Sequence, residues 1–209
     1  MKMRSIWAIA LIAILNISGA EATQSSAETI LDSLAVKGRA AKTGYPRDQF
    51  GQRWADVNRN GCDTRNDILQ RDLKNITYKP GTHNCVVLTG TLIDPYSGIE
   101  INFVRGNVTS MEVQIDHVVA LSNAWQTGAF KLTLEKRTAF ANDPDNLLAV
   151  KGSLNSQKGD GDAATWLPPL KSYRCAYVTK QIVVKARYGL WVTAPEKAAM
   201  KNILAKCKG

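Results

Sequence analysis

The chain has 209 residues, a formal net charge of +9 and 44% hydrophobic residues. This length can bury a sizeable core and leaves little room for a second full domain, so one domain is expected. The charge suits a polyanionic partner, but many exported proteins are basic for solubility alone, so charge by itself decides little.

The first residues have the pattern of a secretory signal peptide. A short basic region precedes an apolar run over 6–17, and Ala20-Glu21-Ala22 offers an A-x-A cleavage site. The run is too short to favour a membrane span, although an uncleaved anchor is the alternative. We expect residues 1–22 to be removed. The mature chain, residues 23–209, is then secreted or periplasmic, without stable membrane association.

The expected elements of the first half follow from hydrophobic periodicity and from turn residues. They are, in order, a helix over 29–41, a loop over 44–50, a helical stretch that ends near residue 73, and a hairpin of strands over 86–93 and 99–104.

The second half begins with the strand Val113-Gln114-Ile115-Asp116, which continues into His117. The later elements are helices over 120–127 and 132–141, a turn over 143–146, a strand over 147–150, a helix capped by Ser153, a helix over 172–188, and a last helix that starts at a capping box formed by Thr193 and Glu196. There are no internal repeats and no low-complexity linker. The expected fold is a single α+β domain.

All four cysteines lie in the mature chain, and their even number in an exported protein predicts two disulfides. No C-x-x-C pair exists and only two histidines are present, so a structural zinc site lacks its usual ligand pairs. Three pairings are possible, and the chain order favours Cys62–Cys85 with Cys175–Cys207. The second bond would join the last two helices.

Four polar residues at fixed distances are the most informative pattern. Asp116 and His117 end a strand, Asn146 follows His117 by twenty-nine residues, and Asn155 follows Asn146 by nine. Each alone has a simpler explanation: a surface pair, a turn residue and an exposed helical amide. Together they are the parts that a metal-dependent phosphodiesterase needs.

The chemistry assigns each of them a different role. Asp116 offers a charged oxygen and Asn155 a neutral one to a divalent metal, for which Mg²⁺ is expected, with Mn²⁺, Ca²⁺ and Zn²⁺ as alternatives. His117 has the pKa of a general base for water. Asn146 is expected to tie the hairpin arms together by side-chain hydrogen bonds to the backbone.

Two basic side chains are candidates for phosphate contacts. Lys158 lies three residues after Asn155, on the same face of the predicted helix. Arg65 follows Asp63 just after a cysteine, and is either a phosphate clamp near the metal or half of a surface salt bridge.

The stretch from Gln114 to Pro169 resembles a family of secreted bacterial His-Asn-His (HNH) endonucleases, which share a domain with the C-terminal part of the GmrSD restriction enzymes. The resemblance rests on Ile115-Asp116-His117-Val118-Val119-Ala120-Leu121, Phe140-Ala141-Asn142-Asp143 and Lys158-Gly159-Asp160, and extends to Gly61-Cys62-Asp63-Thr64-Arg65-Asn66 and Tyr173-Arg174-Cys175.

The resemblance implies a single disulfide-stapled α+β domain, built around a ββα-metal core over about 111–162 with additional helices, and metal-dependent hydrolysis of nucleic acid. It makes His117 the base, Asp116 and Asn155 metal-facing, and Asn146 structural. The chain departs from the eponymous pattern by carrying Asn155 where the last histidine stands, which leaves the choice of metal open.

A possible structural calcium site precedes this region. Asp56, Asn58, Asn60 and Gly61 match the first half of an EF-hand loop, and Asp67 falls at its twelfth position. The aspartate is shorter than the usual bidentate glutamate, and a plain polar turn explains the segment equally well.

The leading hypothesis is a monomeric, secreted endonuclease of low sequence specificity, since no base-reading module is recognisable. DNA is the expected substrate and RNA the alternative. The rival is a non-catalytic exported nucleic-acid-binding protein on the same scaffold, which would not require Asp116, His117 and Asn155 together. A calcium-stabilised extracellular module is the third option.

Overall fold

The computed structural model describes residues 19–207, with side chains from residue 26 onward. Most of the predicted signal peptide therefore lies outside the described residues. The helix α1 (Gly19–Ser33) already covers the predicted cleavage site. None of the helices within the described range has the length and apolar content needed to span a bilayer.

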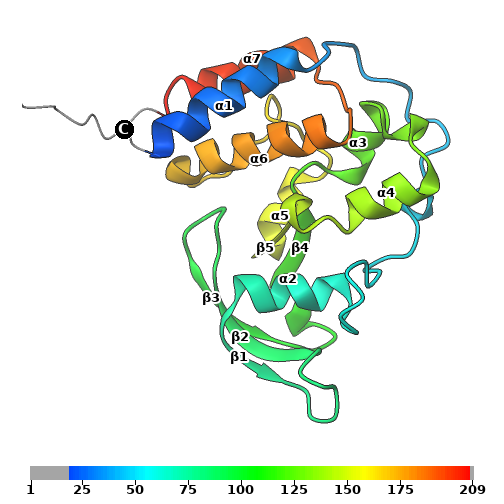
Figure 1. Cartoon of the computed structure of the whole chain (residues 1–209). Coiled ribbons are helices and arrows are strands. Elements are labelled where there is room, and N and C mark those ends of the chain that lie inside the picture. The colour runs from blue at the N-terminus through cyan, green and yellow to red at the C-terminus, as the bar shows by residue number, and fades with distance from the viewer. Residues whose placement is uncertain (1–18, 208–209) are drawn as a thin grey trace, which may run out of the picture.

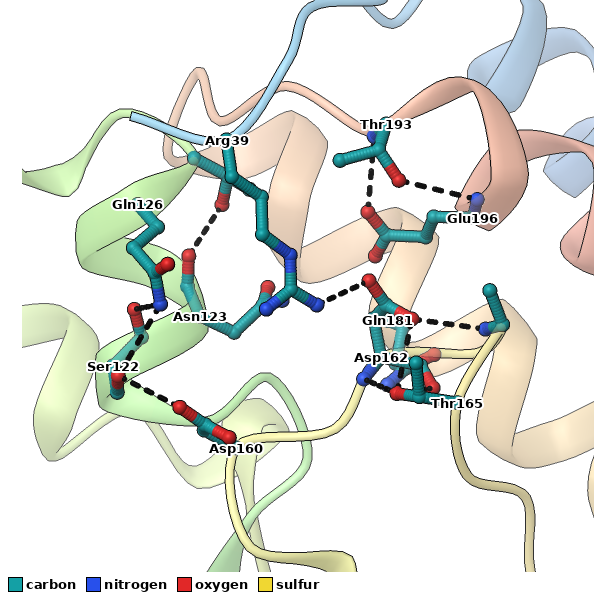
Figure 2. Close-up of polar contacts among 12 residues, drawn as sticks. Arg39, Ser122, Asn123, Gln126, Asp160, Asp162, Thr165, Gln181, Thr193 and Glu196 are labelled. Atoms are coloured by element: carbon teal, nitrogen blue, oxygen red, sulfur yellow. Dashed lines mark hydrogen bonds and ion pairs between the residues drawn. The ribbon is translucent and has the colours of Figure 1, made fainter. Parts of the chain in front are cut away.

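Three helices form a layer at one end of the molecule (Figure 1). They are α1, α6 (Arg174–Arg187) and α7 (Ala194–Leu204). Buried residues from all three share one core, which includes Leu31, Ile182 and Met200. The predicted capping box is present at the start of α7, where the side chains of Thr193 and Glu196 each accept a hydrogen bond from the other residue's backbone N–H (Figure 2).

The segment after α1 is extended, so the predicted helix over 29–41 is wrong beyond Ser33. Its backbone pairs instead with a distant part of the chain, because Val36 forms a parallel bridge with Val192. Arg39 then donates from Nη2 to Oδ2 of Asp162 over 2.7 Å (Figure 2). These long-range contacts outweigh the local preference for a helix.

A three-stranded antiparallel sheet lies at the opposite end, in the order β1-β2-β3. The predicted hairpin corresponds to β2 (Val87–Ile93) and β3 (Glu100–Val104). The edge strand β1 (Lys74–Tyr78) was not predicted from the sequence. It is irregular: its pairing with β2 has register shifts, and Asn75 has a φ of 51°. The helix α2 (Thr64–Asp72) contributes Ile68 and Leu69 to the core beneath this sheet.

The centre of the molecule is a pair of antiparallel strands followed directly by a short helix. These are β4 (Val113–His117), β5 (Leu147–Lys151) and α5 (Gly152–Lys158). Residues on one face of the pair belong to the core of the three-stranded sheet, and those on the other face belong to the core of the helical layer. The pair is therefore covered on both sides, which accounts for its nearly continuous apolar sequence.

The helix α5 starts without a side-chain cap, so the prediction that Ser153 caps it is wrong. The tight connection from β5 depends on Gly152, whose backbone N–H donates to the carbonyl of Glu112 over 2.9 Å. A Cβ at Gly152 would lie 1.9 Å from the carbonyl oxygen of Met111. Only glycine allows this approach of two backbones.

The remaining helices, α3 (Leu121–Gln126) and α4 (Leu134–Ala141), pack around a third core. A 3₁₀ turn at Arg47–Phe50 contacts both of them and buries Phe50 against Trp125 and Phe140. The segment expected to be a plain loop is thereby fixed beside the end of β4.

Both disulfides join the partners that the chain order favours. Cys62–Cys85 links the loop before α2 to the connection between β1 and β2, with a Cα–Cα distance of 5.0 Å. Cys175–Cys207 links α6 to a residue three positions beyond the end of α7, with a Cα–Cα distance of 5.8 Å.

Reduction of both disulfides is expected to lower the melting temperature of the protein by about 8–32 °C. Each bond contributes roughly 2–4 kcal/mol by restricting the unfolded chain, and 1 kcal/mol corresponds to about 2–4 °C in a chain of this size. Differential scanning calorimetry with and without dithiothreitol measures the shift. An unchanged transition in fully reduced protein, verified by thiol titration, contradicts the expectation.

Candidate active site

Asp116 and His117 lie at the end of β4 and face opposite sides of the strand pair. The side chain of Asp116 lies on the face of the strand pair that packs against the helical layer. The side chain of His117 lies on the opposite face, together with Val113 and Ile115. This is the alternation of a regular strand. Both side chains are nevertheless buried, at 4% and 7% exposure, and both line one cavity.

Both carboxylate oxygens of Asp116 accept a strong hydrogen bond. The hydroxyl of Tyr96 donates to Oδ2 over 2.5 Å, and Nζ of Lys158 donates to Oδ1 over 2.9 Å. Burial, and then the adjacent Asp116 carboxylate, raise the pKa of Tyr96 well above its usual value, so this hydroxyl stays protonated and remains a donor. The carboxylate is thus held in one orientation.

Lys158 is fully buried, and its ammonium also donates to the carbonyl of His117 over 2.8 Å. It occupies the last position of α5 and points back toward β4, whereas Asn155 is only half-buried. The expectation that these residues share one exposed face is therefore not met. In this structure Lys158 neutralises Asp116 and does not face open solvent.

His117 is fixed on two sides. Its Nε2 lies 2.9 Å from the carbonyl of Ala141, and since a carbonyl only accepts, Nε2 carries the proton in the neutral ring. The indole of Trp54 stacks on the imidazole at 6.0 Å with an interplanar angle of 13°. The remaining nitrogen, Nδ1, is left as an acceptor with no hydrogen-bond partner among the described residues.

Burial lowers the pKa of His117 to about 3, opposed by the hydrogen bond to Ala141 and assisted by nearby cations such as Arg47. The folded protein therefore binds fewer protons than the unfolded chain between pH 6.5 and 3. The stability linked to His117 is present above pH 6.5 and is lost as the pH falls, by up to about 5 kcal/mol. Nuclear magnetic resonance should show the His117 ring still neutral at pH 5, and a midpoint near 6.5 would contradict this.

Asn146 and Asn155 differ in their surroundings. Asn146 is fully buried, accepts from the backbone N–H of Val119 over 2.8 Å, and donates to the carbonyls of Val119 and Phe140. It thereby connects the residues after β4 to those before β5. The amide nitrogen of Asn155 donates to Oε1 of Gln114 over 2.9 Å, and no described residue donates to its oxygen.

Three adjoining hollows surround this region, and Arg47 lines all of them. The first, of ≈ 310 Å³, contains Asp116, His117 and Asn155. A second, of ≈ 400 Å³, shares Asn155 and Arg47 with it and adds Arg53 and Arg65. The third lies on the other side of His117. The structure therefore brings the predicted residues Asp116, His117, Asn155 and Arg65 to one continuous cleft, and excludes Asn146 and Lys158 from its surface.

The arginines of this cleft lack acidic partners. Among residues 26–207, Arg47, Arg53 and Arg65 make no ion pair, and Arg53 only covers the indole of Trp54. The side chain of Asp63 caps α2 by accepting from Asn66, so the alternative that Arg65 is half of a surface salt bridge finds no support among these contacts. Burial, and then Arg105, lower the pKa of Arg65. Such a cluster of unpaired cations favours an anionic ligand.

The calcium-like loop is closed by its own hydrogen bonds. Asp56 accepts from the backbone N–H groups of Asn60 and Gly61, and Asp67 accepts from the side-chain amides of Asn58 and Asn60. The four predicted ligands do converge, but each is satisfied without an ion. Within the described part of the chain, no group of three histidines, cysteines or acidic residues is placed to hold a metal.

Several residues in and around the cleft were not singled out from the sequence. Tyr96 comes from the turn between β2 and β3, and Arg47 and Trp54 come from the segment before α2. No signal in the sequence places the ring of Trp54 against His117, because this contact joins two segments that lie far apart in the chain.

The protein is a small mixed α/β domain with two disulfides. Its cleft contains arginines without acidic partners and surrounds the buried carboxylate of Asp116 and the imidazole of His117. The family model described as "GmrSD restriction endonucleases, C-terminal domain" matches residues 63–203. The chain belongs to this family, which points to nuclease activity in general.

The chain also matches a relative over most of its length. The chain is 38% identical over 185 residues to a protein of Arthroderma benhamiae described as an "uncharacterized secreted protein", covering 88% of this chain and 85% of the relative. This relative is fungal, whereas the resemblance found in the sequence was to bacterial proteins. No solved structure matches the chain.

Proposed function

We propose that the protein is a secreted, metal-dependent HNH-type endonuclease that hydrolyses phosphodiester bonds of nucleic acid with low sequence specificity. The observation that carries the proposal is that Asp116, His117 and Asn155 line one cavity. Unpaired arginines extend that cavity into a basic cleft. DNA is the expected substrate, with RNA as the alternative.

The order of elements supports an HNH-type core. Two antiparallel strands, β4 and β5, are followed by the helix α5, with the acid–imidazole pair at the end of the first strand and Asn155 on the helix. Asn146 connects the strands by hydrogen bonds to the backbone, which is the structural role proposed for it.

A divalent metal fits the donors of this cavity. The oxygen of Asn155 has no hydrogen-bond donor among the described residues, and the carboxylate of Asp116 keeps free lone pairs after its two hydrogen bonds. Two protein oxygens suit Mg²⁺, which keeps most of its water shell. A metal held by Asp116 and Asn155 would stabilise negative charge on the phosphate.

His117 is the proposed general base. The carbonyl of Ala141 holds the proton on Nε2, and the stacked Trp54 fixes the plane of the ring. Burial lowers the pKa of His117, so the ring is neutral at neutral pH and its Nδ1 is free to accept a hydrogen bond from water. Lys158 and Tyr96 act as positioning residues, because both hold the carboxylate of Asp116.

Arg47 and Arg65 are the proposed phosphate contacts. Replacing both by alanine should raise KM and reduce the slope of log KM against log salt by about 2, since each phosphate contact contributes roughly 0.9 to the slope. Lys201→Ala removes a charge from the far helical layer and serves as a matched control. Steady-state kinetics from 50 to 300 mM NaCl measure the slope. A slope equal to that of the wild type would exclude both arginines from the phosphate path.

Incubation of mature protein with supercoiled plasmid and with RNA, in Mg²⁺ or in EDTA, tests the proposal. We expect metal-dependent nicking of the plasmid. An Asn155→Ala variant purified in the same way serves as a control for contaminating nuclease. Its nicking activity should be strongly reduced. The rival proposal of a non-catalytic binding protein predicts retardation of DNA in a gel without cleavage in any metal.

A further inference from the structure

We propose that the third hollow, which adjoins His117, binds one unstacked nucleobase beside the phosphodiester bond that is cleaved. The inference rests on the proposed nuclease function and deepens it, because it identifies the conformation of the substrate. It is carried by three observations: the lining of this hollow, an unpartnered buried acceptor on one of its lining residues, and its position next to the cleft.

The hollow has an apolar floor and a polar rim. Phe50, Leu121 and Ala141 form buried parts of its wall, and the rings of Trp54 and His117, which stack on each other, also line it. Its volume is ≈ 240 Å³. An apolar cavity of about 150 Å³ accommodates benzene, so this one can admit the larger ring of a base. Aromatic walls suit a nucleobase, since every base has a π-face.

Asn142 supplies the second observation. It lines the hollow at 1% exposure, and its amide nitrogen donates to the carbonyls of Thr138 and Gln52. Since both partners are acceptors, the orientation of the amide is fixed, and Oδ1 is the atom without a partner. A buried acceptor left in this state favours a ligand with an N–H group. Every nucleobase has one on its Watson–Crick edge, which agrees with low sequence specificity.

The hollow is also placed correctly for a nucleotide. His117, Leu121 and Arg47 line both this hollow and the one that contains Asp116 and Asn155. A phosphate in the basic cleft therefore has the hollow next to it, separated by His117. A base can enter only when it is unstacked, so the preferred substrate is single-stranded or locally unpaired nucleic acid.

Single-stranded oligonucleotides with one abasic site test the inference. At the bonds next to the abasic site, cleavage in Mg²⁺ should be about tenfold slower than in the intact strand, the factor that corresponds to ~1.4 kcal/mol, whereas distant bonds should be cut equally. Equal cleavage of all bonds overturns the nucleobase site and leaves the nuclease proposal standing. Absence of cleavage of any substrate contradicts the proposed function itself.

A variant with a larger side chain in the lining of the hollow should lose the preference for intact strands. Ala141→Leu adds bulk to the lining and keeps the backbone carbonyl that holds His117, so the ratio of intact to abasic cleavage should fall to about one. Ala139→Leu, on the exposed side of the same helix, should keep the wild-type ratio. A wild-type ratio in Ala141→Leu overturns the proposed location.

Binding without turnover provides a measurement that does not depend on the fold of a variant. Wild-type protein in EDTA is titrated into a fluorescent single-stranded tetranucleotide, and into the same strand with a central abasic site. The dissociation constant should be about tenfold higher for the abasic strand. Equal constants overturn the inference.

Discussion

His117→Ala is expected to lower the rate of phosphodiester hydrolysis by about 10²–10⁴-fold, the usual contribution of a general base. The ring is the only titratable group in the cleft held in a neutral form with a free acceptor nitrogen, among the residues that the structure describes. Its loss removes the proton acceptor and leaves the arginines and the metal-facing oxygens in place. The effect should therefore appear mainly in kcat, with a smaller change in KM because His117 also lines the proposed nucleobase site.

The second histidine of the chain provides a matched control. His83 is exposed in the connection between β1 and β2 and lines none of the three hollows. His83→Ala should retain wild-type kcat and KM. Comparable losses in both variants, or full activity of His117→Ala in protein freed of contaminants by ion exchange, would remove His117 from the chemistry.

The sequence predicted the parts of the fold that depend on local patterns. The hairpin of β2 and β3, the capping box of Thr193, and the order of β4, β5 and α5 all follow from periodicity and from turn residues. The cysteine pairing agreed with the simplest order along the chain. The spacing from Asp116 to Asn155 identified residues that do line one cavity.

The contacts that define the cleft were out of reach, because they join segments far apart in the chain. Tyr96 bonds Asp116 across twenty residues, and Trp54 stacks on His117 from before α2. Lys158 was expected outside, since an i, i+3 relation to Asn155 suggests one face. The short helix instead directs it inward, where the Asp116 carboxylate offers a charge to pair with. A charged side chain is buried only where a partner of opposite charge is present, and a single sequence does not show which residues become partners in the fold.

Lys158→Met is expected to destabilise the folded protein by about 3–5 kcal/mol, because it leaves the carboxylate of Asp116 buried with no cationic partner. Tyr96 still donates one hydrogen bond, so the carboxylate is not wholly unsatisfied. For a chain of this size the melting temperature should fall by roughly 6–20 °C. Lys136→Met, on the exposed surface of α4, should change it by little.

A double variant separates loss of the ion pair from loss of packing. Asp116→Asn removes the buried charge, so Lys158→Met should cost less in that background than in the wild type, by about 1–3 kcal/mol of coupling. Urea unfolding of the wild type and the three variants gives the four free energies of unfolding that the cycle needs. Activity is not a suitable measurement here, because Asp116 is a proposed metal ligand. Strictly additive effects would mean that Lys158 stabilises the fold through its packed stem and its bond to the carbonyl of His117, and that Asp116 is available to a cation without competition.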